Sequence, residues 1–157
     1  MKKKKIIAVA SLGGHWIQLL RVAKPLELWY DVVYMSTHEK CRTMVEGKRF
    51  YSILDFNRRN PWKMFAAIFK CIYVLLIVRP SAVVTTGAAP GLLTLLLAKL
   101  FFVNTIWIDS VANVKTLSAC GHLARYFARH VYTQWSDLAD DDVEYVGNIF
   151  GDSMETK

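Results

Sequence analysis

Short apolar runs alternate along this chain with longer segments that have the periodicity of helices. The runs are rich in β-branched residues and apolar at most positions, which is typical of strands buried on both faces of a parallel sheet. The predicted strands are Ile6–Ala10, Asp31–Ser36, Phe50–Phe56, Ala82–Gly87, Asn104–Ser110 and His130–Trp135, and a further short strand is expected within Val143–Asn148.

The segments between these runs predict helices. After the first strand, Trp16, Leu19 and Ala23 fall on one helical stripe, which Pro25 is expected to end or kink. Prolines also suit the first turns of the next two helices. The predicted helices run from about Trp16 to Pro25, from Pro61 to Val78, from Pro90 to about Phe102 and from Ser118 to Ala128.

Strands that alternate with helices predict an α/β fold, a Rossmann-like parallel sheet with helices on both faces and right-handed crossovers. The 157 residues are the usual size of one domain. We therefore expect a single Rossmann-like domain over residues 1–150 and a mobile tail over residues 151–157. In the usual order of such a sheet the first and fourth strands are neighbours, and ligands bind beyond their carboxyl ends.

Two glycine-rich turns are predicted at this ligand-binding edge. Ser11–His15 follows the first strand, and Thr85–Gly91 follows the fourth. Each turn leads into a helix N-terminus, whose free N–H groups and dipole favour an anion, so the pair would suit a diphosphate. The candidate binding residues are Ser11, Gly13, Gly14, Thr86, Gly87 and Gly91. The alternative is that these glycines only form tight strand-to-helix turns.

His15 and Asp109 are the candidate catalytic bases. His15 is predicted at the first turn of a helix beside the diphosphate site. Near neutral pH, an imidazole there can accept the proton of a sugar hydroxyl. Asp109 ends the fifth strand at the same edge. Either residue could instead be structural, the histidine as a satisfied ring and the aspartate as a helix cap or turn former. The sequence alone does not choose between them.

Two nucleotide-binding motifs are absent from the sequence. There is no GxGxxG, and the second strand ends in Ser36 and Thr37 rather than in a ribose-binding carboxylate, which disfavours a nicotinamide- or flavin-dependent oxidoreductase. There is also no GxxxxGK[ST] motif of a P-loop enzyme. The 3 cysteines have no CxxC spacing and predict neither a zinc site nor a redox pair. We therefore expect no metal and no cofactor.

The net charge of +7 predicts a negatively charged partner. No nucleic-acid-binding motif is visible, so we expect phosphate groups or an anionic membrane rather than nucleic acid. The apolar part of the second helix, Met64–Val78, contains Lys70 and is too short to span a bilayer. It would lie on the membrane surface or, alternatively, pack against the sheet. The candidate membrane-contact residues are Arg58, Arg59, Lys63, Phe65 and Phe69.

Three segments together resemble one protein family: SLGGHWIQLL, TTGAAPG and IWIDSVANVKTLSACGHLARYFARHVYTQWSDLA. The family comprises the acceptor-binding subunit of the two-subunit UDP-N-acetylglucosaminyltransferase of asparagine-linked glycosylation and the related bacterial exopolysaccharide glycosyltransferase subunits. The enzyme that adds N-acetylglucosamine to peptidoglycan lipid I looks like a more distant relative, with a similar glycine–histidine turn. The resemblance extends from Ile6 to about Ile149.

The resemblance implies one half of a GT-B glycosyltransferase that is divided between two chains. This chain would be the N-terminal, acceptor-side half, inactive without a partner subunit that binds the UDP-sugar. The complex would transfer a sugar, with inversion, to a polyprenyl-diphosphate-linked saccharide in bacterial polysaccharide biosynthesis. The alternative is a non-catalytic adaptor that recruits a separately competent glycosyltransferase to the membrane.

The sequence departs from the family pattern at several positions. The family often has glutamate where Asp109 stands, a basic residue at Asn113 and proline at Ser136. Eukaryotic members carry an N-terminal membrane anchor, whereas four lysines precede the first strand here. We therefore expect a bacterial member that is attached peripherally to the cytoplasmic face of the inner (plasma) membrane.

Overall fold

One parallel sheet organises the chain, of which the computed structural model describes residues 3–56 and 62–151. The strands are β1 (Lys5–Ala10), β2 (Asp31–Ser36), β3 (Phe50–Ser52), β4 (Ala82–Thr85), β5 (Asn104–Ile108), β6 (His130–Thr133) and β7 (Glu144–Tyr145). They follow the order β3-β2-β1-β4-β5-β6-β7, and every neighbouring pair is parallel. The predicted Rossmann-like fold class and the pairing of the first strand with the fourth are confirmed.

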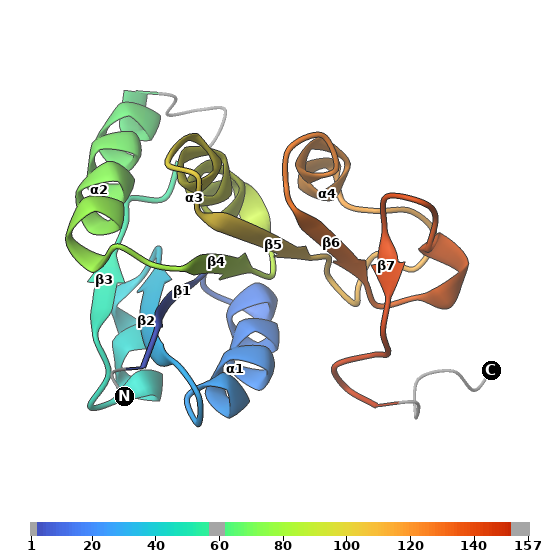
Figure 1. Ribbon diagram of the computed structural model, residues 1–157, viewed down its shortest axis with the longest axis horizontal. Coiled ribbons are helices and arrows are strands. Elements are labelled where there is room, and N and C mark those ends of the chain that lie inside the picture. The colour runs from blue at the N-terminus through green and yellow to red at the C-terminus, as the bar shows by residue number, and fades with distance from the viewer. Residues whose placement is uncertain (1–2, 57–61, 152–157) are drawn as a thin grey trace.

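Helices cover both faces of this sheet (Figure 1). The α-helices are α1 (Gly14–Leu26), α2 (Trp62–Val78), α3 (Ala88–Leu100) and α4 (Ala119–Ala124), and the short 3-10 helices are η1 (Glu39–Val45) and η2 (Ser136–Leu138). In Figure 1, α1 lies below the sheet, whereas α2, α3 and α4 lie above it. The layers are therefore helix, sheet and helix, as the alternation of elements predicted.

The strands direct their side chains alternately into two hydrophobic cores. In β1, Ile7 and Val9 belong to the core that the sheet forms with α2 and α3. Ile6, Ala8 and Ala10 belong to the core on the opposite face, beside α1. Because both faces are covered, the strand is apolar at every position rather than at every second one.

Some element ends differ from the predicted ones. β3 stops at Ser52 instead of Phe56, and the sequence pattern did not predict η1. α3 begins at Ala88, two residues before Pro90, because Gly87 forms its N-cap with a φ of 131°. A glycine can adopt this backbone conformation without a Cβ penalty, so the helix starts earlier than the proline signal indicates.

The C-terminal ends of α1 and α4 differ from the predicted ones. α1 includes Pro25 in its last turn and ends one residue later, at Leu26. α4 begins after its N-cap Ser118 and ends at Ala124, where a 3-10 bond from Phe127 N–H to the Ala124 carbonyl tightens the chain. Of the predicted mobile tail, residues 152–157 lie outside the described residues.

Candidate functional site

The turns after β1 and β4 meet at the carboxyl edge of the sheet. Val9 pairs with Thr85, so both strands end at the same level. The Thr86 hydroxyl donates to the His15 carbonyl oxygen at 2.6 Å, and ring nitrogen Nδ1 of His15 lies 2.8 Å from the Thr86 carbonyl oxygen. Two reciprocal contacts therefore join the glycine turns, although His15 and Thr86 are 71 residues apart in the sequence.

The contact with Thr86 fixes the tautomer of the His15 imidazole. A carbonyl oxygen can only accept, so Nδ1 of the half-buried ring must carry the proton and donate it. In the neutral ring Nε2 then keeps its lone pair, and within the described part of the chain this atom has no hydrogen-bond partner. The arrangement is that of a histidine oriented by a backbone carbonyl to act as a base through Nε2.

Gly87 leaves the space that this imidazole occupies. Its φ is 131°, and a Cβ at this position would lie 2.6 Å from His15 Nδ1 and 2.7 Å from Cε1. The Gly87 N–H donates to the Thr85 hydroxyl at 3.1 Å, which fixes the peptide beside the ring. Glycine is required here for two reasons, the backbone conformation and the close approach of the ring.

Changing Gly87 to alanine should displace the His15 ring. In the two-chain enzyme that the family resemblance implies, we expect turnover to fall at least about tenfold, because a small misplacement of the candidate base would have large effects. Gly47→Ala is the matched control, since Gly47 also has a positive φ, 76°, but nothing lies within 4 Å of its Cβ position. Steady-state turnover of both variants tests this, and equal losses in the two would show that backbone strain, not the ring, is responsible.

A hollow of about 550 Å³ opens between these turns and the end of β2. It is lined by Ser11, Leu12, Thr37, His38, Asp55, Phe56, Ala88, Ala89 and Pro90. Ala88 and Ala89 belong to the first turn of α3, where backbone N–H groups have no partner within the helix. The hollow therefore adjoins a helix N-terminus of the kind that binds anions.

His38 faces this hollow and was not among the predicted site residues. It caps η1, and its Nδ1 accepts the N–H of Lys40 at 3.1 Å. Its neutral tautomer is therefore the reverse of that of His15, with the proton on Nε2, available for donation. The sequence signal was its place two residues after the end of β2, because the residues that follow a parallel strand lie at the ligand-binding edge.

The predicted glycines have different roles. Gly13 and Gly14 are exposed at the start of α1, and Gly13 forms the N-cap with a φ of 107° and no side-chain cap. The first N–H groups of α1 are therefore open to a ligand. Gly91 is instead buried, and a Cβ there would collide with the Thr85 hydroxyl. Because Gly91 has no side chain, α3 can pack closely against Thr85 of β4.

Asp109 is buried, with 2% of its surface exposed, and both of its carboxylate oxygens are occupied. Oδ1 accepts from Trp107 Nε1 at 3.0 Å and from the Ser118 hydroxyl at 2.6 Å. Oδ2 accepts from Ser118 N–H at 2.8 Å and from Asn113 Nδ2 at 3.1 Å. Four donors saturate this carboxylate, so Asp109 holds the 109–118 loop, and we propose His15 rather than Asp109 as the base.

The loop that Asp109 holds is also tied to α1 and to β6. Gln18 of α1 donates through Nε2 to the Ser110 hydroxyl at 3.0 Å and accepts the Val111 N–H at 3.4 Å. Trp135, which follows β6, donates through Nε1 to the Val111 carbonyl at 2.9 Å. Within the long third segment of the family resemblance, residues 109–118 therefore form one hydrogen-bonded loop at the carboxyl edge of the sheet.

The cysteines are unsuited to nucleophilic or metal chemistry. Burial raises the pKa of the Cys41 and Cys71 thiols. Burial, and then the neighbouring Asp109 carboxylate, raise the pKa of Cys120. All three thiols therefore stay protonated at neutral pH. Within residues 3–56 and 62–151, no group of three His, Cys, Asp or Glu side chains is placed to hold a metal ion.

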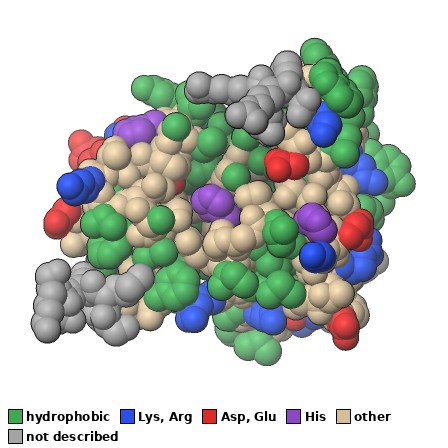
Figure 2. All heavy atoms as spheres, turned by 180° about the vertical axis from the view of Figure 1, so that it is seen from behind, with side chains coloured by type: hydrophobic (Ala, Val, Ile, Leu, Met, Phe, Trp, Pro, Cys, Tyr) green, Lys and Arg blue, Asp and Glu red, His purple; other side chains and the backbone are tan. Residues whose placement is uncertain are grey.

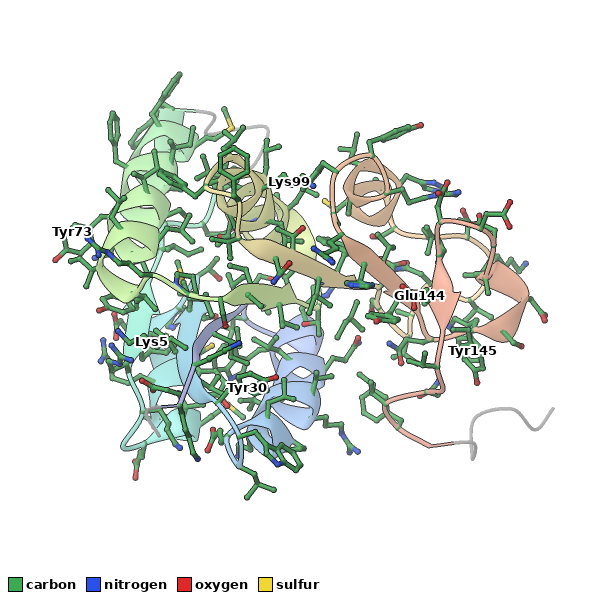
Figure 3. All side chains as sticks on the ribbon, in the orientation of Figure 1. Lys5, Tyr30, Tyr73, Lys99, Glu144 and Tyr145 are labelled. Atoms are coloured by element: carbon green, nitrogen blue, oxygen red, sulfur yellow. The ribbon has the colours of Figure 1, made fainter. Side chains whose placement is uncertain are left out.

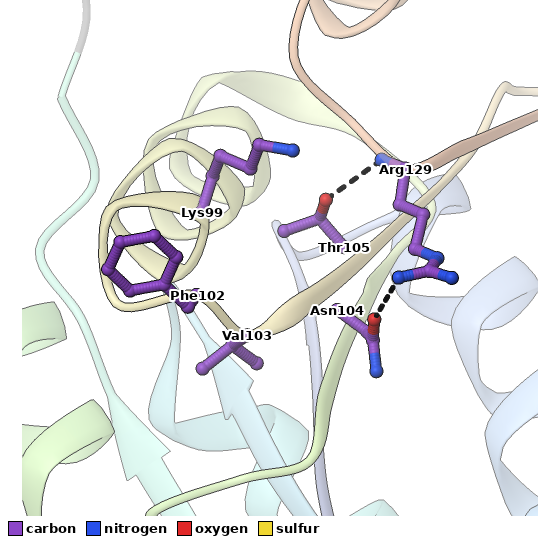
Figure 4. A pocket seen from close by; sticks show the side chains of 6 residues that line it. All are labelled: Lys99, Phe102, Val103, Asn104, Thr105 and Arg129. Carbon is purple, nitrogen blue, oxygen red and sulfur yellow. Dashed lines mark hydrogen bonds between the residues drawn. The ribbon is translucent and has the colours of Figure 1, made fainter.

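A second hollow lies at the amino-terminal edge of the sheet (Figure 4). It has a volume of about 330 Å³ and is lined by Lys99, Phe102, Val103, Asn104, Thr105 and Arg129. Arg129 donates to Asn104 Oδ1 at 3.2 Å, and its backbone N–H donates to the Thr105 hydroxyl at 3.0 Å. β5 begins at Asn104, so this basic hollow lies at the opposite end of the strands from the glycine turns.

α2 has two apolar faces. One face is buried against the sheet and α3, through Ala67, Cys71, Val74, Leu75 and Val78. The other carries a stripe of exposed side chains at helical spacing: Trp62, Phe65, Phe69, Tyr73 and Leu76. Figure 3 shows Tyr73 directed away from the sheet, and Figure 2 shows hydrophobic side chains gathered on this side of the molecule. We call these five residues the α2 stripe.

The α2 stripe includes two of the predicted membrane-contact residues. Phe65 is 62% exposed and Phe69 is 73% exposed. Lys63 lies beside Trp62 of this stripe, with its ammonium 5.7 Å from the centre of the Trp62 ring. Arg58 and Arg59 lie outside the described residues. No helix in the described ranges is long and apolar enough to cross a bilayer.

Solved structures confirm the fold. MurG from Acinetobacter baumannii is 18% identical and superposes with a TM-score of 0.77 over 92% of this chain and 45% of its own. UDP-N-acetylglucosamine 2-epimerase from Rickettsia bellii is 12% identical (TM-score 0.70; 94% of this chain, 46% of its own). The UDP-GlcNAc-bound 2-epimerase from Neisseria meningitidis is 15% identical (TM-score 0.71; 92% and 47%). The fold is that of the N-terminal half of GT-B glycosyltransferases, and this chain spans less than half the length of these proteins.

Sequence comparison identifies the family. Curated protein sequences give no significant match. The family model of the Alg14-like oligosaccharide biosynthesis proteins matches residues 32–149, which is more than half of the chain. The match includes the second glycine turn, the loop held by Asp109 and the segment around Trp135. This chain therefore belongs to the Alg14-like family of oligosaccharide biosynthesis proteins.

Proposed function

We propose that this chain is the acceptor-side subunit of a two-chain glycosyltransferase. The complex transfers a sugar from a UDP-sugar to a polyprenyl-diphosphate-linked saccharide in bacterial polysaccharide biosynthesis. Membership of the Alg14-like family supports a role in oligosaccharide synthesis. The observation that carries the proposal is the reciprocal contact between His15 and Thr86, which sets a free imidazole nitrogen beside two helix N-termini.

His15 acts as the general base in this proposal. Its Nε2 removes the proton from the acceptor hydroxyl as that oxygen attacks the anomeric carbon of the donor sugar. The bond from that carbon to the UDP oxygen breaks, UDP leaves with the electron pair, and the configuration is inverted. The Thr86 carbonyl holds the Nδ1 proton and so stabilises the imidazolium that forms.

The diphosphate of the acceptor lies in the hollow beside α1 and α3. The N–H groups at the start of α1, next to Ser11, Gly13 and Gly14, and those at Ala88 and Ala89 supply donors without any positive side chain. His38 Nε2–H adds a donor from the β2 side. Thr86 and Gly87 position the His15 ring rather than contact the phosphates.

The donor-binding half belongs to a partner subunit. This chain corresponds to less than half of the structurally similar proteins, one of which was solved with UDP-GlcNAc bound. The partner stabilises the departing UDP across a cleft that faces the glycine turns. This placement agrees with the rule that ligands of open parallel sheets bind at the carboxyl ends of the strands.

The α2 stripe attaches the complex peripherally to the cytoplasmic face of the plasma membrane. Its aromatic side chains are suited to the interface between headgroups and acyl chains. Lys63 and Lys70, with the sequence-adjacent Arg58 and Arg59, supply positive charge for anionic headgroups. Such an attachment brings the hollow to an acceptor that is itself anchored in the bilayer.

The two-chain reaction can be tested by reconstitution. The chain is co-expressed with a donor-binding glycosyltransferase subunit, and the purified complex is incubated with lipid extract and a panel of radiolabelled UDP-sugars. We expect a labelled lipid-linked product from the complex and none from either chain alone. Full activity of the partner by itself would contradict the shared active site and support the adaptor function instead.

A further inference from the structure

An apolar groove lies beside the diphosphate hollow, between α2, α3 and the region of α4. Its volume is about 410 Å³, and it is lined by Phe56, Met64, Ala89, Leu92, Leu93, Leu96, Leu123, Tyr126 and Phe127. The Tyr126 hydroxyl is the sole polar side-chain atom of this lining. Leu96, Leu123 and Tyr126 are exposed, so apolar surface remains uncovered in the chain alone.

The groove and the hollow are continuous. Phe56 and Ala89 line both of them. Ala89 lies in the first turn of α3, where the free N–H groups face the hollow, and Leu92, Leu93 and Leu96 follow on the next turns. From Ala89 to Leu96 the axis of α3 rises about 10 Å, which is the length of about two five-carbon isoprene units.

This arrangement matches an amphiphile with an anionic head and a branched hydrocarbon tail. A peptide in extended form would leave its N–H and C=O groups unpaired against the leucine walls, which is costly. A hydrocarbon chain has no such groups and gains from each carbon removed from water. The helices that line the groove, α2, α3 and α4, lie on one side of the sheet (Figure 1), and α2 also carries the α2 stripe, so a chain leaving the groove has a short path to the bilayer.

We infer that this groove binds the isoprene units of the lipid carrier nearest the diphosphate. The inference rests on the proposed function. It adds that the chain recognises the hydrocarbon part of the acceptor, by burying it in the groove. The carrier is held at two places, its diphosphate at the helix N-termini and its first isoprene units along α3. The saccharide then extends from the diphosphate toward His15.

The test uses soluble diphosphates of increasing chain length, namely inorganic pyrophosphate, dimethylallyl diphosphate and geranyl diphosphate, titrated calorimetrically into the full chain. We expect the affinity to rise at least about tenfold with each isoprene unit, because each buries five carbons. Equal affinities for pyrophosphate and geranyl diphosphate would overturn the groove but leave the diphosphate site standing. If no diphosphate binds at all, the proposed acceptor site fails together with the groove.

Variants of α3 separate groove binding from general effects. Leu96→Gln should weaken geranyl diphosphate binding at least about tenfold and leave pyrophosphate binding unchanged. Leu100→Gln is the matched control, since Leu100 is exposed on the same helix but does not line the groove. Leu123→Gln should repeat the Leu96→Gln result from the opposite wall. If these variants impair assembly with the donor-binding subunit while lipid binding persists, the groove is a protein-docking site and the inference is wrong.

Discussion

Replacing His15 with alanine should lower the turnover of the proposed two-chain enzyme by about 10²- to 10⁴-fold, the range typical of a lost general base. Assembly of the complex and acceptor binding should be preserved, because the hydrogen bond from the Thr86 hydroxyl to the His15 carbonyl oxygen does not involve the imidazole and still joins the two turns. The measurement is single-turnover sugar transfer at saturating acceptor and donor. A drop in the chemical step with unchanged binding identifies His15 as the base.

The control is another histidine of this chain. His122 is exposed, contacts the Thr116 hydroxyl and lies outside both the hollow and the groove, so His122→Ala should retain full turnover. His38→Ala should weaken acceptor binding while changing the chemical step little, since His38 lines the hollow as a donor. If His15→Ala and Asp109→Asn both transfer sugar at the normal rate, the chain is a membrane adaptor.

Asp109→Ala should have the largest effect on stability. It would leave the donors of Trp107, Asn113 and Ser118 without their acceptor in a site where Asp109 is 2% exposed. We expect the free energy of unfolding to fall by about 3–5 kcal/mol, the usual cost of removing one partner from a buried charged network. Gly121 adds to this cost, because its backbone packs directly against the carboxylate.

Urea denaturation followed by circular dichroism measures this loss. Asp109→Asn keeps the size of the side chain but places an amide N–H₂ group opposite hydrogen-bond donors. The free energy of unfolding should therefore fall less than in Asp109→Ala, but still detectably. Asp137→Ala is the control, because Asp137 is exposed and has only a 3.4 Å contact with its neighbour Ser136. Unchanged stability of Asp109→Ala would contradict the structural role and return Asp109 to the candidate bases.

The periodicity of the sequence predicted most of the sheet but not all of its connections. β2 has the predicted bounds, and β1 differs by one residue. Both were predictable because a continuous apolar run bounded by polar residues marks a strand that is buried on both faces. η1 was missed, because its two buried residues, Cys41 and Val45, are too few to set a period. The early end of β3 was missed because Ile53, although buried, follows the last residue paired with β2.

The sequence by itself determined the fold class, the adjacency of the two glycine turns and their candidate chemistry. The first depends on local properties, namely buried runs and glycine flexibility, and the adjacency depends on a strand order that such sheets share. Only the tertiary structure shows the contacts on which we propose His15 rather than Asp109 as the base, namely a carbonyl 71 residues from the imidazole and a carboxylate saturated by four donors. Hydrogen-bond partners distant in sequence are set by how layers pack, and residue spacing along the chain does not encode them.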